Sequence, residues 1–261
     1  GLTETCAGGT LQDPADLRTN VAGFPIASVE IRMESTPEVL DRSGKPYLST
    51  DTEDVQGNPV FGRGEICIRG PSLSSGYYMM PEKTREDFKE NGWFHTGDIG
   101  QFLSDGSVRI VDRKKNLVKL KGGEYVALEN MEATYTNSSF VDGIHGGLCC
   151  YGDGDMDRPV ALIQLNDVYT MQWAKANGIE GDFETVKKSE ALNKAVKKKK
   201  KKEHAKSDLS HIEKLVGVAL LTEPWTPENG CLTAANKLQR RVVTEVFSKE
   251  LAELRKKGIF D

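Results

Sequence analysis

The chain has 261 residues, of which 38% are hydrophobic and 28% are charged, and its formal net charge is −4. Such a composition is typical of a globular protein with one large or two ordinary domains. The charge balance provides no basic field, so we expect no nucleic-acid partner. No run reaches the roughly 18 to 20 apolar residues of a membrane-spanning helix.

The cysteines and histidines show no metal-binding spacing. The five cysteines are scattered along the chain, and the four histidines do not cluster with them in the sequence. We therefore expect reduced, mostly buried thiols and no structural zinc site.

The first part of the chain reads as short strands. Residues 1–20 form a glycine-rich loop and a polar connection, and 34–60 are a turn-rich excursion. Alternating or apolar runs predict strands, and a proline followed by acids predicts a helix start. The segment 21–33 contains Gly23 and Pro25 and then the alternating ASVEIRM (27–33), which predicts a strand. The other elements are strands at 64–70 and 107–112, a helix start at 81–84 and a hairpin at 104–107. Short strands with frequent glycine predict a small, partly open β-barrel from about residue 20 to 112.

The second part interleaves strands with helices. The predicted strands are 147–151, 160–165 and 216–221. The predicted helices are 129–135, 168–176, 183–202 and 238–254. The last helix is amphipathic, and its apolar face consists of Leu238, Val242, Val246, Leu251 and Leu254. This order predicts a separate α+β domain. The fold class is therefore α+β and multidomain, with a large-domain part at 1–112, a hinge at 113–116 and a mobile domain at 117–261.

Two acidic turns are candidate ligand sites. Hydroxyl groups flank Glu4 in the Gly1–Thr5 stretch; Thr3 could donate to a phosphate and Glu4 could hold Mg²⁺. Taken alone, this stretch favours a polar loop with a capping threonine. Asp98 follows a glycine turn and could accept hydrogen bonds from both hydroxyls of a ribose, although Thr-Gly-Asp is also a common turn.

Cations and glycines follow at the predicted domain boundary and near the end of the chain. The run from Arg113 to Lys115 is either a solvated surface or a set of cations that reaches ribose and phosphate. Gly122 and Gly123 provide backbone that can approach a ligand or rotate. Lys237 is either an ordinary surface lysine or a mobile cation that neutralises charge as a carboxylate attacks a phosphate.

The six consecutive lysines at Lys197 to Lys202 have two interpretations. The favoured one is a solvated, low-complexity insertion. The other is attachment to an anionic membrane, at about 1 kcal/mol per lysine near the bilayer.

Five motifs occur in one order: GLTET (1–5), GYY-x-x-PEKT (76–84), GWFHTGDIG (92–100), DRKKNLVKLKGGEYVALE (112–129) and TAANKLQRR (233–241). In this order and at these separations they resemble the adenylate-forming (AMP-binding) ligase superfamily, and most of all the eukaryotic long-chain acyl-CoA synthetases. The resemblance covers essentially the whole chain except the lysine tract.

The resemblance implies a reaction in two steps. A fatty-acid carboxylate attacks the α-phosphate of ATP to give acyl-adenylate and pyrophosphate, and the thiol of CoA then displaces AMP. For the first step it implies that Thr3 contacts the α-phosphate, that Glu4 holds Mg²⁺, and that Lys237 bridges the carboxylate and the α-phosphate.

The remaining motif positions are implied to hold the nucleotide and to move the smaller domain. Asp98 would bind the ribose hydroxyls with support from Arg113. Lys115 would be the hinge residue between the two half-reactions. Gly122 and Gly123 would lie on the face that lines the CoA tunnel.

The chain begins at Gly1 inside one of these motifs, and the family's phosphate loop and fatty-acid tunnel are expected upstream. We therefore expect the C-terminal portion of a long-chain fatty-acid–CoA ligase that is inactive by itself. The expected location is the cytoplasm or the cytosolic face of an intracellular membrane, with the endoplasmic reticulum favoured. The alternatives are a non-catalytic module that docks on a partner or an anionic membrane, and a relative that activates an aryl or amino acid.

Overall fold

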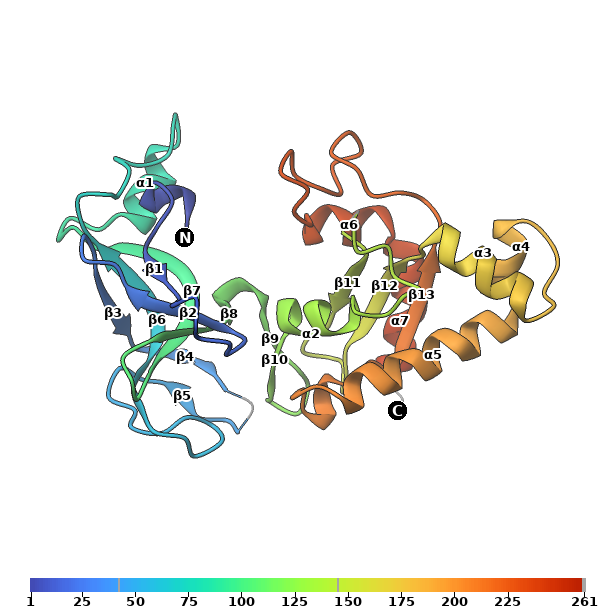
Figure 1. The fold of residues 1–261 in the computed structure, drawn as a ribbon, viewed down its shortest axis with the longest axis horizontal. Coiled ribbons are helices and arrows are strands. Elements are labelled where there is room, and N and C mark those ends of the chain that lie inside the picture. The colour runs from blue at the N-terminus through green and yellow to red at the C-terminus, as the bar shows by residue number, and fades with distance from the viewer. Residues whose placement is uncertain (42, 145, 260–261) are drawn as a thin grey trace. The chain divides into compact units, whose positions relative to one another are not determined.

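The computed structural model describes residues 1–41, 43–144 and 146–259 (Figure 1). Its internal contacts divide the chain into two units, Gly1–Leu117 and Val118–Asp261. The division falls next to the predicted hinge at 113–116, whose movement stays a prediction. Over the described ranges, no helix has both the length and the apolar character needed to cross a bilayer.

The first unit contains a six-stranded sheet with the strand order β1-β2-β8-β7-β6-β3. Every neighbouring pair is antiparallel. The strands are β1 (Thr10–Leu11), β2 (Val21–Pro25), β3 (Glu30–Glu34), β6 (Val60–Arg69), β7 (Phe94–Leu103) and β8 (Val108–Arg113). The sheet curls into a half-barrel (Figure 1), which confirms the predicted partly open barrel.

Smaller elements surround this sheet. The turn-rich excursion expected at 34–60 contains a short pair of antiparallel strands. The elements are β4 (Thr36–Leu40), β5 (Pro46–Tyr47), the helix α1 (Pro81–Asp87) and the 3-10 turns η1 (Thr3–Thr5) and η2 (Lys114–Asn116). The helix α1 confirms the helix start predicted at Pro81.

Strand β6 begins four residues before the predicted strand at 64–70, and two glycines in its first half have unusual backbone angles. Gly62 and Gly64 have φ values of +94° and +154°. A Cβ atom at Gly62 would lie 2.6 Å from the carbonyl oxygen of Ser49, and one at Gly64 would lie 2.1 Å from that of Glu34. Glycine therefore lets neighbouring backbone approach the strand closely, as at a bulge.

The second unit is built on a three-stranded sheet. Strand β11 (Leu148–Tyr151) pairs antiparallel with β12 (Val160–Gln164), which pairs parallel with β13 (Gly217–Leu221). The other elements are β9 (Leu117–Lys119), β10 (Tyr125–Ala127), α2 (Leu128–Tyr135), α3 (Asp167–Ala176), α4 (Phe183–Lys188), α5 (Glu190–Ala205), the 3-10 turn η3 (His211–Glu213), α6 (Arg240–Val246) and α7 (Ser248–Ile259). The predicted α+β character is confirmed.

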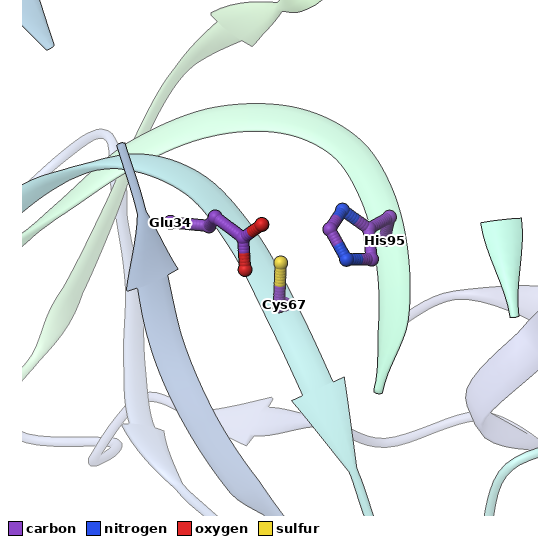
Figure 2. Close-up of side chains that lie close together, drawn as sticks. All are labelled: Glu34, Cys67 and His95. Atoms are coloured by element: carbon purple, nitrogen blue, oxygen red, sulfur yellow. The ribbon is translucent and has the colours of Figure 1, made fainter. Parts of the chain in front are cut away.

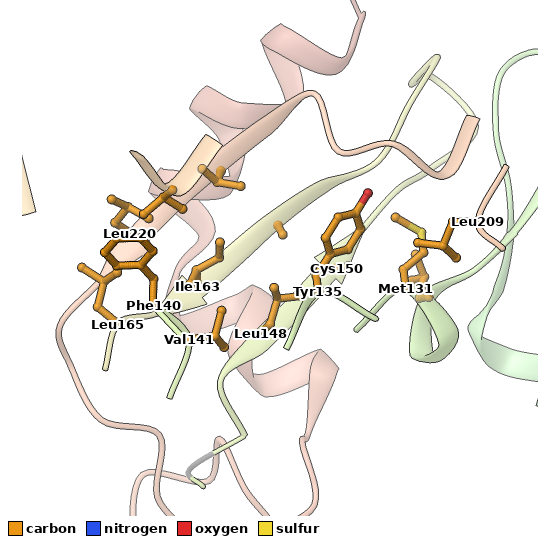
Figure 3. Close-up of a cluster of buried hydrophobic side chains, with 14 of the residues drawn as sticks. Met131, Tyr135, Phe140, Val141, Leu148, Cys150, Ile163, Leu165, Leu209 and Leu220 are labelled. Carbon is orange, nitrogen blue, oxygen red and sulfur yellow. The ribbon is translucent and has the colours of Figure 1, made fainter. Parts of the chain in front are cut away.

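Alternating side chains of this sheet enter two separate cores. Leu148, Ile163 and Leu220 pack with α2 and α5 on one face (Figure 3). Cys149 and Leu162 on the other face pack with residues of α6 and α7. The period of two therefore places a helical layer on each side of the sheet.

Two predicted helices are interrupted. The helix expected at 183–202 ends at Lys188 and restarts after Ser189, whose Oγ accepts a hydrogen bond from the amide of Leu192 at 3.2 Å. The helix expected at 238–254 breaks at Phe247, so its predicted apolar face is wrong at Val246, which is 53% exposed. The buried positions around this break are Val243, Phe247, Leu251 and Leu254.

The lysine tract lies inside α5 and is not uniformly solvated. Four of its side chains are exposed, but Lys200 is only 5% exposed. The interpretation of a solvated, low-complexity insertion is therefore wrong for Lys200, because this residue falls on the buried side of a regular helix.

Candidate active site

Asp98 and Arg113 face each other on the neighbouring strands β7 and β8. Nε of Arg113 lies 2.9 Å from Oδ1 of Asp98, and the two side chains are 39% and 10% exposed. The sheet therefore brings together the two residues predicted to hold a ribose. Asp98 supplies a sheltered carboxylate that can accept hydroxyl hydrogens, and Arg113 remains accessible at its edge.

A bulge in β7 sets the direction of Asp98. Gly97 has a φ of +72°, a conformation that glycine adopts without strain. Its amide donates to Oε1 of Glu65 at 3.0 Å. Thr96 accepts from the amide of Asp98 at 3.0 Å and donates to the carbonyl of Ile66 at 2.8 Å. Hydrogen bonds to Glu65 and Ile66 of β6 therefore hold the backbone that precedes Asp98 in place.

Glu4 lies beside Tyr77 and is half-buried in the first unit. The hydroxyl of Tyr77 is 2.8 Å from Oε1 of Glu4 and 3.1 Å from Oδ2 of Asp87. Burial and the hydrogen bond to Glu4 raise the pKa of Tyr77 well above its usual range, so the phenol stays protonated and can donate. Thr3 is exposed, and among the described residues its side chain has no hydrogen bond to Tyr77 or Asp87.

The loop after Glu4 contains strained backbone. Cys6 and Ala7 have φ values of +47° and +98° although neither is glycine. Such conformations are uncommon and cluster at functional sites. The strain marks this loop as more than the polar connection that its composition suggests.

Glu4 has the chemistry of a Mg²⁺ ligand. Its Oε1 is engaged by Tyr77, and among the described contacts none engages Oε2. Magnesium is commonly held by one or two carboxylates together with substrate phosphates and water. One carboxylate with an open oxygen in a half-buried loop fits that pattern.

Gly122 and Gly123 form the turn of the β9–β10 hairpin. The amide of Leu120 donates to the carbonyl of Glu124 at 2.9 Å, and that of Gly123 donates to Leu120 at 2.9 Å. Gly123 has a φ of +91° with no atom within 4 Å of its Cβ position. Lys115, in η2, is exposed. Gly123 therefore presents open backbone, and Lys115 presents an exposed cation.

Lys237 is displayed by a tight turn in the second unit. The amide of Thr233 donates to the carbonyl of Lys237 at 2.8 Å, and Thr233 Oγ1 accepts from the amide of Lys237 at 3.1 Å. Asn236 adopts a φ of +56° at the tip. The Lys237 side chain is exposed and has no ion-pair partner within the described ranges. A turn of this kind holds the backbone and leaves the ammonium group available.

Arg240 anchors this turn to α2. Its Nη2 lies 3.0 Å from Oε2 of Glu132, its Nη1 also contacts Oε1, and Nη1 donates to the carbonyl of Cys150 at 2.7 Å. Burial opposes the charge of Arg240, but the hydrogen bonds that it donates to Glu132 raise its pKa above the usual range. Arg240 therefore stays charged, and the pair fixes the chain three residues after Lys237.

A second polar cluster lies on the first unit's sheet (Figure 2). Ligand atoms of Glu34, Cys67 and His95 lie within 4.8 Å of one another. The expectation that histidines stay apart from cysteines is therefore wrong for His95, whereas His145 lies outside the described residues. Arg32 already pairs with Glu34. Burial, with the charges of Glu65 and Glu34, raises the pKa of Cys67 to about 12, and a protonated thiol is a poor metal ligand.

Three residues that shape the site were not singled out from the sequence. Tyr77 supports Glu4, Glu65 holds the Gly97 bulge, and Glu132 anchors Arg240. Tyr77 lies inside the GYY motif, so the motif was the available signal. Glu65 and Glu132 act through contacts that span 32 and 108 residues, and such distant pairing is invisible in a single sequence.

Sequence comparisons find relatives along nearly the whole chain, although no protein-family model matches it. The chain is 37% identical over 255 residues to fatty acyl-CoA synthetase B of Dictyostelium discoideum, covering 97% of this chain and 35% of that protein. It is 36% identical over 259 residues to long chain acyl-CoA synthetase 3 of Arabidopsis thaliana, covering 99% and 36%. The chain therefore spans about a third of the length of these curated relatives.

Solved structures of adenylation domains share the fold. The adenylation domain of a carboxylate reductase from Mycobacterium chelonae aligns with a TM-score of 0.71 and 26% identity, covering 91% of this chain and 33% of that one. The A-PCP didomain of a carboxylic acid reductase from Segniliparus rugosus, in complex with AMP, gives 0.69 and 28%, covering 91% and 30%. Sequence and fold together therefore place the chain in the adenylate-forming (AMP-binding) superfamily, as a homologue of the long-chain acyl-CoA synthetases.

Proposed function

We propose that the chain provides the ribose-holding strands and the lysine-bearing unit of a long-chain fatty-acid–CoA ligase. The enzyme would use ATP to convert a fatty acid into acyl-AMP and would then transfer the acyl group to CoA. The names of the relatives support this reaction. Because the chain spans about a third of their length, the activity is proposed for the enzyme to which these residues contribute.

The pairing of Asp98 with Arg113 carries this proposal. A carboxylate that is sheltered and fixed by a neighbouring guanidinium can accept both ribose hydroxyls without reorganisation. The similarity to the S. rugosus structure that contains AMP supports a nucleotide at this site.

Three residues are proposed to act on the phosphate. Thr3 would donate to the α-phosphate and Glu4 would hold Mg²⁺ through its open oxygen. When bound, Mg²⁺ would neutralise phosphate charge. Lys237 would contact both the incoming carboxylate and the α-phosphate, so that two anions can approach each other. Its exposed position on a rigid turn supports this role.

The other motif residues are proposed to serve the second step. Lys115 would be the point about which the second unit turns, and the open hairpin at Gly122 and Gly123 would line the path of CoA. The cytosolic face of the endoplasmic reticulum or the cytoplasm remains the proposed location.

A chimera tests this function. The chain would replace the matching residues of the D. discoideum fatty acyl-CoA synthetase B, and ATP–pyrophosphate exchange would be measured with a long-chain fatty acid. We expect exchange from the folded chimera, loss of exchange in its Asp98→Ala variant, and none from the 261 residues alone. A folded chimera without exchange, or equal exchange after Asp98→Ala, would contradict the proposal.

A further inference from the structure

A pocket of about 310 Å³ lies in the second unit beside α5. Its walls are the lysine tract, the start of β13 with the residues before it, the chain just before β12, and Tyr135 at the end of α2 (Figure 3 shows Tyr135). Five of the lining side chains are cationic and none carries a carboxylate: Arg158, Lys197, Lys200, Lys201 and Lys214.

Lys200 occupies a position where the helix otherwise buries apolar side chains. Leu192, Val196 and Lys200 follow at intervals of four and are the buried residues of α5. Lys200 is 5% exposed, and none of the described contacts gives its ammonium group a hydrogen bond or an ion pair. Burying an unpaired cation is costly, so a structure that places one against a pocket is suited to receive an anion there.

The acidic residues of α5 form ion pairs with lysines that do not line the pocket. Glu190 pairs with Lys194 at 2.8 Å, and Glu203 pairs with Lys199 at 3.8 Å. Neither lysine lines the pocket. The ion pairs of the helix therefore neutralise its outward lysines and leave the cations around the pocket without counter-charges in the described structure.

The uncharged part of the wall is rigid. The hydroxyl of Tyr135 donates to the carbonyl of Glu213 at 3.0 Å and accepts from the amide of Leu215 at 3.4 Å. These bonds tie α2 to the segment that precedes β13. The cations therefore surround a preformed space, which limits the ordering that a ligand must induce.

We propose that this pocket binds a compact anion with several phosphate groups, with the largely buried side chain of Lys200 in its wall. Five cations exceed what one carboxylate or one sulfate can neutralise, and phosphate oxygens accept several charge-assisted hydrogen bonds at once. The volume is at the small end of ligand pockets, which are typically about 300 to 1,000 Å³, so the ligand is compact. Free inositol phosphates and phosphoinositide headgroups share this chemistry.

Calorimetric titration of the whole chain with inositol 1,4,5-trisphosphate tests the proposal. We expect saturable binding that Lys200→Met weakens at least tenfold. Lys198→Met is the matched control, because it removes an exposed lysine of the same tract that does not line the pocket; we expect less than a twofold change. Lys214→Met, outside the helix, should also weaken binding and guards against misfolding of the Lys200 variant.

Vesicles distinguish the two sources of the anion. Phosphatidylcholine vesicles with about 5% phosphatidylinositol 4,5-bisphosphate should bind the chain with the same variant pattern if a headgroup enters the pocket. Binding of the soluble phosphate alone would assign a free metabolite. Absence of binding to both probes at millimolar concentration, or equal weakening by Lys198→Met and Lys200→Met, would overturn the proposal in favour of a diffuse surface charge.

Discussion

Arg240 and Glu132 form a bidentate ion pair that joins the turn bearing Lys237 to the helix α2. Their side chains are 21% and 12% exposed. The amide of Cys150 also donates to Glu132 at 2.7 Å, so the pair reaches the central sheet as well. The turn that bears Lys237 is therefore tied to both α2 and the central sheet of the second unit.

Removing one partner of this pair should destabilise the second unit. We expect Glu132→Ala to lower the free energy of unfolding by about 3 to 5 kcal/mol, because it leaves Arg240 buried and unpaired. Urea denaturation measures the loss. The control is Glu245→Ala, which breaks the exposed pair with Arg241 and should cost less than about 1 kcal/mol. Equal costs for the two variants would contradict a structural role for the buried pair.

Asp98→Asn should weaken nucleotide binding much more than it weakens the fold. Losing the charge-assisted hydrogen bonds to a ribose should cost about 1.5 to 3 kcal/mol, roughly a 10- to 100-fold increase in the Kd for AMP. The ion pair with the partly exposed Arg113 contributes less than about 1 kcal/mol to stability. Calorimetry of AMP binding and thermal unfolding separate the two effects. A large fall in stability with unchanged AMP affinity would show that Asp98 is structural.

Gly97→Ala should distort the site by backbone strain. The φ of Gly97 is +72° and no atom lies within 4 Å of its Cβ position; the same holds for Gly106, with a φ of +85°. Each alanine variant should therefore lose about 1 to 2 kcal/mol of stability. Only Gly97→Ala should weaken AMP binding, because Gly106 lies in the hairpin turn away from Asp98. Equal AMP affinities would show that the bulge does not orient Asp98.

Local patterns predicted most of the fold. The apolar runs of β11, β12 and β13 and the proline that opens α1 each identified an element close to its observed bounds. The failures have physical causes that lie outside the local pattern. The glycines of β6 are required by contacts with Ser49 and Glu34, and the break at Phe247 leaves Val246 of α6 exposed.

The sequence predicted only part of the candidate site. The turn at Asp98 and the cation at Arg113 were recognised, and their direct pairing followed only once the strands were aligned. The burial of Lys200, in contrast, could not be predicted from the sequence. A run of identical residues hides which member falls on the buried face, and only the register of α5 against Leu192 and Val196 identified it.

Lys200→Met should stabilise the protein in a pH-dependent way. Burial lowers the pKa of Lys200 from 10.5 to about 7, opposed by Cys150 and assisted by Lys197. The pocket also places Arg158 and Lys214 nearby, and Tyr135 faces it as a neutral phenol. Below about pH 7 the ammonium is charged in both states and the full burial penalty applies; above 10.5 the amine is neutral in both states and the penalty is absent.

The increase in the free energy of unfolding caused by Lys200→Met should therefore be largest near pH 6, at roughly 3 to 5 kcal/mol. It should shrink as the pH rises towards 10.5, the pKa of a lysine in the unfolded chain. Urea denaturation of both proteins across this range measures it. Lys198→Met should show no such trend, because its side chain is exposed. A gain that does not vary with pH would indicate improved packing alone.

Lys237→Ala in the chimera, assayed for each half-reaction, tests the central claim most directly. The exposed side chain is not needed for folding, so thermal unfolding should be unchanged. We predict that ATP–pyrophosphate exchange falls at least about 1,000-fold, because the carboxylate and the α-phosphate lose their shared cation. Thioester formation from supplied acyl-adenylate should stay within a few-fold of the unsubstituted chimera. Equal loss of both half-reactions, or retention of exchange, would contradict the role assigned to Lys237.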